Sequence, residues 1–157
     1  MSDTTYAYPG AAALVALHEE HLRAFCDTWR QAAGAGTSLP SVEDPSYASL
    51  EHLLGHVLGA AAHYMTWVCE QLDLPAPDYG RSWAWGPVAG ADLDAALASV
   101  LSGWDGPLAT VLEEQCEKGE YRSAWKMPYT IDSMLEHAVM HPIRHGYQLQ
   151  RLMGTRP

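Results

Sequence analysis

The stretch MLEHAVMHPIRHGYQLQRLM, residues 134–153, places three of the chain's eight histidines at four-residue intervals on a segment of helical composition. A helical wheel turns by about 100° per residue and gathers six side chains of this segment within roughly 80°. These six side chains form one core-facing stripe: Met134, Ala138, His141, His145, Leu149 and Leu152. His141 and His145 are therefore predicted to face the protein interior, where their ring nitrogens need hydrogen bonds or a metal ion.

Side chains four residues apart on a helix project from successive turns in the same direction, so His141 and His145 can reach one ion. Two hydrogen-bonded core histidines are the alternative interpretation. His137 lies about 40° from His141 on the wheel, where an outer-shell role and a surface position both remain open. Pro142 stands between the pair and removes one backbone donor, which predicts a kink near residue 138.

The composition of the whole chain is that of one globular domain spanning residues 1–157. With 157 residues, 48% of them hydrophobic, it can bury a sizeable core. The formal net charge of -10 makes nucleic acid an unfavourable partner, because the surface repels phosphate. No run of about 18 apolar residues and no signal peptide is present, so we expect a cytoplasmic protein without a membrane partner. The cysteines form no CxxC pair and are interpreted as small buried apolar residues: Cys26, Cys69 and Cys116.

Four segments have helical composition and are separated by stretches rich in Gly, Pro and Ser, while no strand is predicted. The helices are expected at about residues 11–33, 47–74, 91–118 (with a bend at 103–107) and 130–153. The connection between the second and third helices is long and irregular, and four of its side chains are candidates for a pocket mouth: Tyr79, Arg81, Trp83 and Trp85. The other tryptophans are interpreted as core or interface residues: Trp29, Trp67, Trp104 and Trp125. The expected fold is all-α, a four-helix bundle with a long crossover connection between helices 2 and 3.

A third metal ligand has to come from another helix. The second segment offers His52, His56 and His63, which cluster within about 40° of one another, away from that segment's apolar stripe. Helical periodicity does not indicate which of the three is the ligand, and solvent exposure is the simpler interpretation of His52 and His63. In the first segment His18 and His21 lie one turn apart and are interpreted as surface histidines, with an extra metal site as the alternative.

Two runs carry a resemblance to a known family. LLGHV at residues 53–57 is similar to the "LxxHI" element of the DinB/YfiT-like metal-binding bundles, and HPIRHGYQL at residues 141–149 is similar to their "HxxxHRGQ" element. The resemblance implies that the metal ligands are His56, His141 and His145, and that Gln148 is the family's glutamine. The chain departs from the pattern where the family's Arg-Gly is replaced by Gly-Tyr at residues 146–147.

Three protein nitrogens would leave a coordination position open, as in catalytic metal sites. Imidazole suits zinc, nickel, iron and manganese, and the ion would lower the pKa of a bound water or thiol. The family includes thiol-dependent S-transferases and mycothiol-dependent maleylpyruvate isomerase. The resemblance thus implies a metal-dependent thiol S-transferase or related hydrolase with a small-molecule substrate, a low-molecular-weight thiol as cosubstrate, and a homodimeric state.

Two other interpretations come from different classes. In the first, the histidines belong to a non-catalytic, stress-responsive metal-binding or assembly module. The second, a di-iron carboxylate bundle, requires Glu-x-x-His pairs, whereas the chain has adjacent Glu and His at residues 51–52 and 136–137. No catalytic role is assigned to the acidic residues nearest the candidate helices, which are interpreted as solvated charges: Glu19, Glu20, Asp27 and Glu136.

Overall fold

Helices make up most of residues 4–79 and 86–155, the parts of the chain that the computed structural model describes. The α-helices are α1 (Pro9–Gly34), α2 (Leu50–Gln71), α3 (Leu93–Trp104), α4 (Glu113–Glu117) and α5 (Ile131–Leu152). Two 3-10 turns, η1 (Pro45–Tyr47) and η2 (Gly90–Asp92), and two strands, β1 (Tyr121–Arg122) and β2 (Pro128–Tyr129), complete the described elements. The all-α class predicted from the sequence is confirmed. None of the described helices has the length and apolarity needed to cross a membrane.

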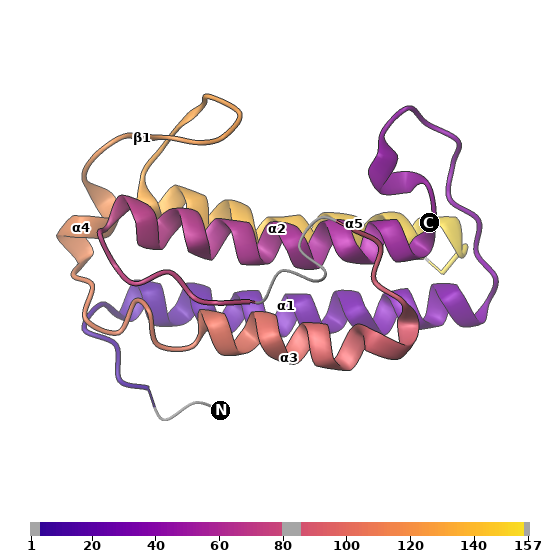
Figure 1. Cartoon of the computed structure of the whole chain (residues 1–157), viewed down its shortest axis with the longest axis horizontal. Coiled ribbons are helices and arrows are strands. Elements are labelled where there is room, and N and C mark those ends of the chain that lie inside the picture. The colour runs from indigo at the N-terminus through magenta and orange to yellow at the C-terminus, as the bar shows by residue number, and fades with distance from the viewer. Residues whose placement is uncertain (1–3, 80–85, 156–157) are drawn as a thin grey trace.

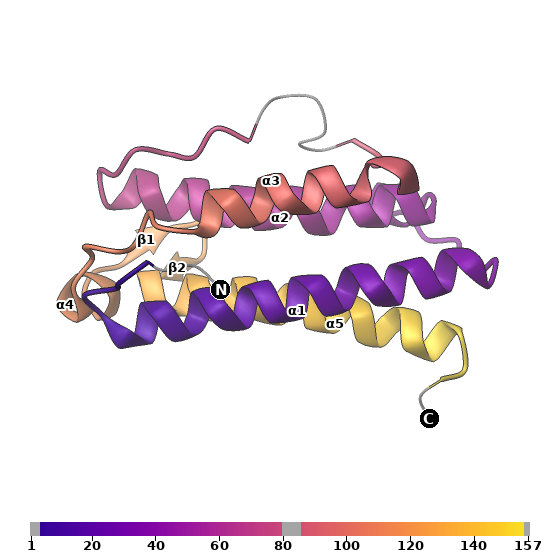
Figure 2. The same cartoon turned by 90° about the horizontal axis from the view of Figure 1, so that it is seen from below.

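The helices α1, α2, α3 and α5 lie side by side along the long axis of the molecule (Figure 1). Seen from below, α2 and α3 form one layer and α1 and α5 the other (Figure 2). Helix α1 packs against α5 and α3, and α2 packs against the same two helices. The backbone N–H of Val88, just before α3, donates to the Glu51 carbonyl at the start of α2 at 3.0 Å. Val88 therefore lies beside the start of α2, and α3 runs in the same direction as α2 (Figure 1).

The two helices that carry the candidate ligands have well-defined starts. At α2, the Ser49 hydroxyl accepts from the His52 backbone N–H at 3.3 Å. At α5, the Thr130 hydroxyl accepts from the Ser133 backbone N–H at 3.1 Å, and the Ser133 hydroxyl accepts from the Thr130 N–H. Such caps satisfy backbone donors that the first helical turn leaves unpaired.

The wheel prediction for α5 is confirmed over most of its length. Five of its six predicted stripe residues are buried, and Leu152, in the last turn, is 44% exposed. The helix continues through Pro142 from Ile131 to Leu152, so His141 and His145 remain on one face.

Two parts of the predicted secondary structure are wrong. The third helix was expected to run from residue 91 to 118, but α3 ends at Trp104. Gly106 has φ +98°, outside the helical region, and Pro107 after it lacks a backbone donor. The prediction of no strand also fails, because Tyr121 pairs with Tyr129 in a short antiparallel hairpin. Two-residue strands are too short to show alternation.

Most of the predicted core residues are buried. The three cysteines are buried and free, and Trp29, Trp67 and Trp104 are each at most 5% exposed. Trp125 differs, because it lies on the hairpin and is 41% exposed. The prediction that these side chains are buried is therefore confirmed for the three cysteines and for three of the four tryptophans.

The interpretation of His18 as a surface residue is wrong. His18 is fully buried, and its ring stacks on Trp104 with centroids 3.6 Å apart and planes at 9°. Neither ring nitrogen has a hydrogen-bond partner among the described residues. Burial, with a smaller effect from His21, lowers the pKa of His18 to about 3. His21 itself is half-buried.

Candidate metal centre

Helices α2 and α5 bring together the three histidines that the family resemblance implied. His56 comes from α2, and His141 and His145 come from successive turns of α5. One ring nitrogen of each lies within 4.8 Å of the other two. The Nε2 atoms of His141 and His56 are 3.1 Å apart. Two nitrogen ligands of tetrahedral zinc lie about 3.3 Å apart, so an ion fits with small side-chain movements.

A hydrogen-bond network fixes the orientation of His145. Its Nδ1 lies 2.9 Å from the Gln148 side-chain oxygen, which also accepts from the Tyr47 hydroxyl at 2.7 Å. Because that oxygen is an acceptor, Nδ1 carries the proton and Nε2 presents a lone pair. Nε2 is buried and has no hydrogen-bond partner among the described residues. A metal ion would satisfy this nitrogen, and Gln148 and Tyr47 would be its outer-shell support.

Burial keeps the three imidazoles neutral. It is the main cause that lowers the pKa of His141 to about 2 and that of His145 to about 4, and the neighbouring histidines and Arg144 act in the same direction. The pKa of His56 is lowered by burial, an effect that Asp44 opposes. Neutral imidazole is the form that binds metal, so protons compete little at neutral pH.

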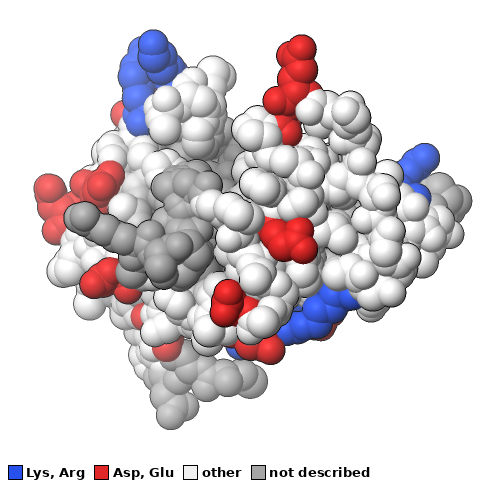
Figure 3. Space-filling view, turned by 45° about the vertical axis from the view of Figure 1, so that its right-hand side comes forward, with Lys and Arg blue, Asp and Glu red and all other residues white. Residues whose placement is uncertain are grey.

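A cavity of about 350 Å³ opens over the three histidines. It is bounded by the β1–β2 hairpin and by the loop between α1 and α2, the two segments that project beyond α2 and α5 (Figure 1). In Figure 3 these two projections stand apart, one with basic and the other with acidic side chains at its tip. The lining residues are Asp44, Tyr47, His56, Tyr64, Trp125, His137, His141, Arg144, His145 and Gln148. An ion held by the histidines would therefore have open space for a further ligand.

Asp44 supplies the carboxylate among these lining residues. It accepts from the Ser46 backbone N–H at 2.9 Å, and this bond is the main cause that lowers the pKa of Asp44. His56 and His145 lower it further. Asp44 is thus ionised at neutral pH beside the candidate ligands.

The acidic residues considered from the sequence do not line this cavity. Glu19 pairs with Arg23 and Asp27 pairs with Arg30 on exposed faces of α1. Glu20 and Glu136 are exposed. Their interpretation as solvated charges is consistent with these positions.

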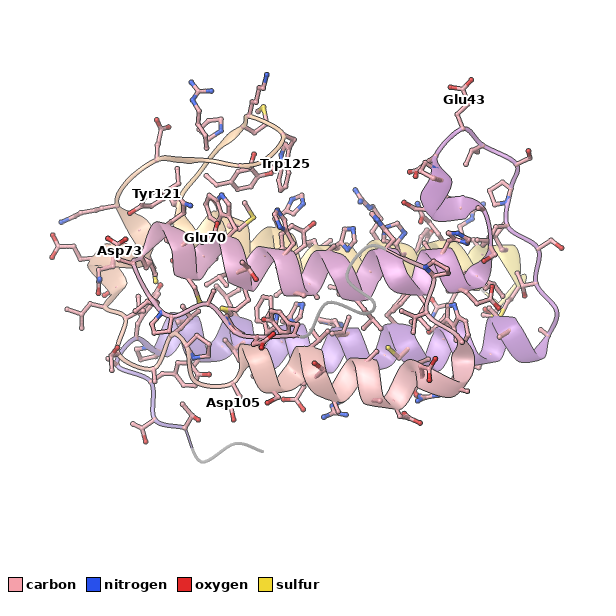
Figure 4. The ribbon with its side chains drawn as sticks, in the orientation of Figure 1. Glu43, Glu70, Asp73, Asp105, Tyr121 and Trp125 are labelled. Atoms are coloured by element: carbon pink, nitrogen blue, oxygen red, sulfur yellow. The ribbon has the colours of Figure 1, made fainter. Side chains whose placement is uncertain are left out.

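Three aromatic rings form one end of the cavity, and we call Tyr64, Trp125 and His137 the aromatic wall. The His137 ring lies 5.4 Å from Tyr64, edge to face, and 5.5 Å from Trp125 at an angle of 31°. Its Nδ1 lies 3.5 Å from the Tyr129 hydroxyl. His137 therefore borders the cavity without joining the cluster of three, and its neighbour Trp125 is labelled on the hairpin in Figure 4.

The other histidines of α2 also lie outside the cluster. His52 and His63 are half-buried rather than exposed, and the His52 Nδ1 lies 2.9 Å from the Ser49 hydroxyl. Among the His, Cys, Asp and Glu side chains of residues 4–79 and 86–155, it is these three histidines that lie close enough together to bind one ion.

Half of the lining side chains were not predicted from the sequence, because they come from loops and from a helix face whose neighbours the sequence does not specify. They are Asp44, Tyr47, Tyr64, Trp125 and Arg144. Of the predicted pocket-mouth residues, Tyr79 packs against Gly103 of α3, and Arg81, Trp83 and Trp85 lie outside the described residues. The chain matches no protein-family model, no curated protein and no solved structure.

Proposed function

We propose that the protein is a metal-dependent enzyme in which His56, His141 and His145 hold a divalent ion with an open coordination position. The observation that carries the proposal is the convergence of three ring nitrogens within 4.8 Å at a cavity of about 350 Å³. The buried, unpartnered Nε2 of His145 supports it, because an unsatisfied buried nitrogen is unfavourable without a ligand. Zinc, nickel, iron and manganese are the candidate ions.

The proposal includes a fold and a reaction class. The fold is a four-helix bundle of the DinB-like type with a crossover between α2 and α3, and the reaction is thiol S-transfer or a related hydrolysis. The LLGHV and HPIRHGYQL runs support this assignment. The contact of Gln148 with His145 supports it too, since the glutamine that the resemblance singled out holds a candidate ligand. A cytoplasmic homodimer is part of the same proposal.

The side chains that line the cavity would have different roles in such a reaction. A divalent ion held here would lower the pKa of a water or thiol that shares its coordination shell. The ionised Asp44 carboxylate is the group that accepts the released proton, through water where the distance requires it. Gln148 and Tyr47 keep the Nε2 lone pair of His145 directed at the ion. The aromatic wall shields one end of the cavity from water.

Activity with a low-molecular-weight thiol and a model electrophile tests this proposal. Metal-loaded wild-type protein should transfer the thiol, and His56→Ala should abolish transfer while the melting temperature stays within a few degrees of wild type. His63→Ala on the same helix is the matched control and should keep activity. If His56→Ala lowers the melting temperature sharply and no thiol or water reaction is found, the ion serves a structural module instead.

A further inference from the structure

Arg144 is a cation at the edge of the candidate centre, and none of the ion pairs among the described residues includes it. It is exposed on α5 and lines both the cavity over the histidines and a groove of about 600 Å³ between α1 and α5. The ion pairs among the described residues engage Arg23, Arg30 and Lys118. The Arg144 guanidinium has no hydrogen bond or ion pair with any described residue. A free guanidinium presents a planar fork of donors that matches a carboxylate.

The charged side chains that line the cavity balance each other, although the whole chain is strongly negative. The chain carries a formal charge of -10, but among the residues that line this cavity Asp44 is the acid and Arg144 the permanent cation. These two charges cancel, so the charge of a bound divalent ion is left uncompensated. Arg144 is also close enough to lower the pKa of His56 and His137, in each case after burial as the larger cause. With a divalent ion bound, the cavity would therefore attract anions while the outer surface repels them.

The aromatic wall adds a planar apolar surface beside this positive charge. Trp125 is 41% exposed although its ring contacts His137 and Tyr64, so part of its surface remains open. Open tryptophan surface on a hairpin is suited to stacking against a flat ligand, because aromatic rings gain from offset and edge contacts. His137 and Arg144 lie seven residues apart on α5, and both line the cavity.

We propose that this cavity binds small aromatic carboxylates, with the carboxylate on Arg144 and the ring against Trp125. The inference deepens the proposed function and rests on it, since it names the substrate class of the same centre. A cavity of about 350 Å³ is at the small end of ligand sites, which fits a single substituted ring rather than a larger molecule.

Calorimetric titration of zinc-loaded protein with benzoate, benzyl alcohol and acetate tests the inference. Benzoate should bind more tightly than either of the other two probes. Arg144→Gln should weaken benzoate binding about tenfold, the factor expected from losing a hydrogen-bonded charge pair. Arg151→Gln, an exposed cation on the same helix away from both cavities, is the matched control and should change it less than about twofold. Trp125→Leu should weaken benzoate binding and leave acetate binding unchanged.

Equal affinities for benzoate and benzyl alcohol, or equal effects of Arg144→Gln and Arg151→Gln, would overturn the inference. Metal content measured on the same samples distinguishes a failure of this inference from a failure of the proposed function. If the protein takes up no metal, the proposed function fails, and titration of the metal-free protein still decides the inference through the Arg144 and Trp125 variants. If metal binds and benzoate does not, the inference fails alone.

Discussion

Replacing His18 by phenylalanine is expected to make the fold less sensitive to acid. The His18 ring is fully buried against Trp104, and neither of its nitrogens has a partner among the described residues. Phenylalanine keeps a ring of similar size in the stack and removes the group that binds a proton. The substitution therefore isolates the titration of His18 from its packing.

The magnitude follows from the pKa of His18 in the two states. Burial holds the folded-state pKa at about 3, while the unfolded chain has the ordinary value of 6.5. Below pH 6.5 the unfolded chain binds a proton that the folded chain does not, so the stability is complete above pH 6.5 and is lost progressively towards pH 3. Between pH 7.5 and 5.0 this loss amounts to about 2 kcal/mol in the free energy of unfolding.

Urea unfolding at these two pH values, with a chelator present, measures the effect. Wild type should lose about 2 kcal/mol more stability than His18→Phe between pH 7.5 and 5.0. His21→Phe, three residues further along α1 and half-buried, is the control and should lose as much as wild type. Equal losses in wild type and His18→Phe would show that burial does not hold His18 neutral in the folded protein.

Three further predictions concern the centre and its surroundings. Gln148→Leu should weaken zinc binding by about 10- to 100-fold in a competition titration, because His145 loses its outer-shell acceptor; an unchanged affinity would contradict the network. Zinc binding should persist to about pH 5, since burial holds the pKa of His145 at about 4; half-loss near pH 6.5 would show ordinary histidines. Gly55→Ala should lower the free energy of unfolding by about 1–3 kcal/mol, because its Cβ would lie 1.9 Å from the Gly86 carbonyl oxygen, whereas Gly34→Ala has open space and should be tolerated.

The helical part of the fold was predictable where one face of a helix repeats over several turns. The stripe of α5 gave both the burial of His141 and His145 and their common direction. The same reasoning should have identified His18, because Leu22, Phe25 and Trp29 follow it at intervals of four, three and four residues and all are buried.

The parts of the fold and of the site that could not be predicted depend on contacts between segments that are distant in the sequence. Nothing local distinguishes His56 from His52 and His63 on α2; only packing against α5 does, and the family resemblance gave the choice. Tyr47 and Gln148 are 101 residues apart, and their hydrogen bond could not be read from either helix alone. The position of Trp125 depends on a hairpin whose strands are too short to show alternation in the sequence.

We expect two of the three evenly spaced histidines of α5, together with His56, to hold a metal ion. Mass spectrometric metal analysis of protein purified without an affinity tag tests it most directly, on wild type and on His137→Ala, His141→Ala and His145→Ala. A stoichiometric divalent ion is expected in wild type and in His137→Ala, and it should be lost in the other two variants. Absence of metal from wild type, even after reconstitution with zinc, nickel and manganese, would show that the three histidines do not form a metal site.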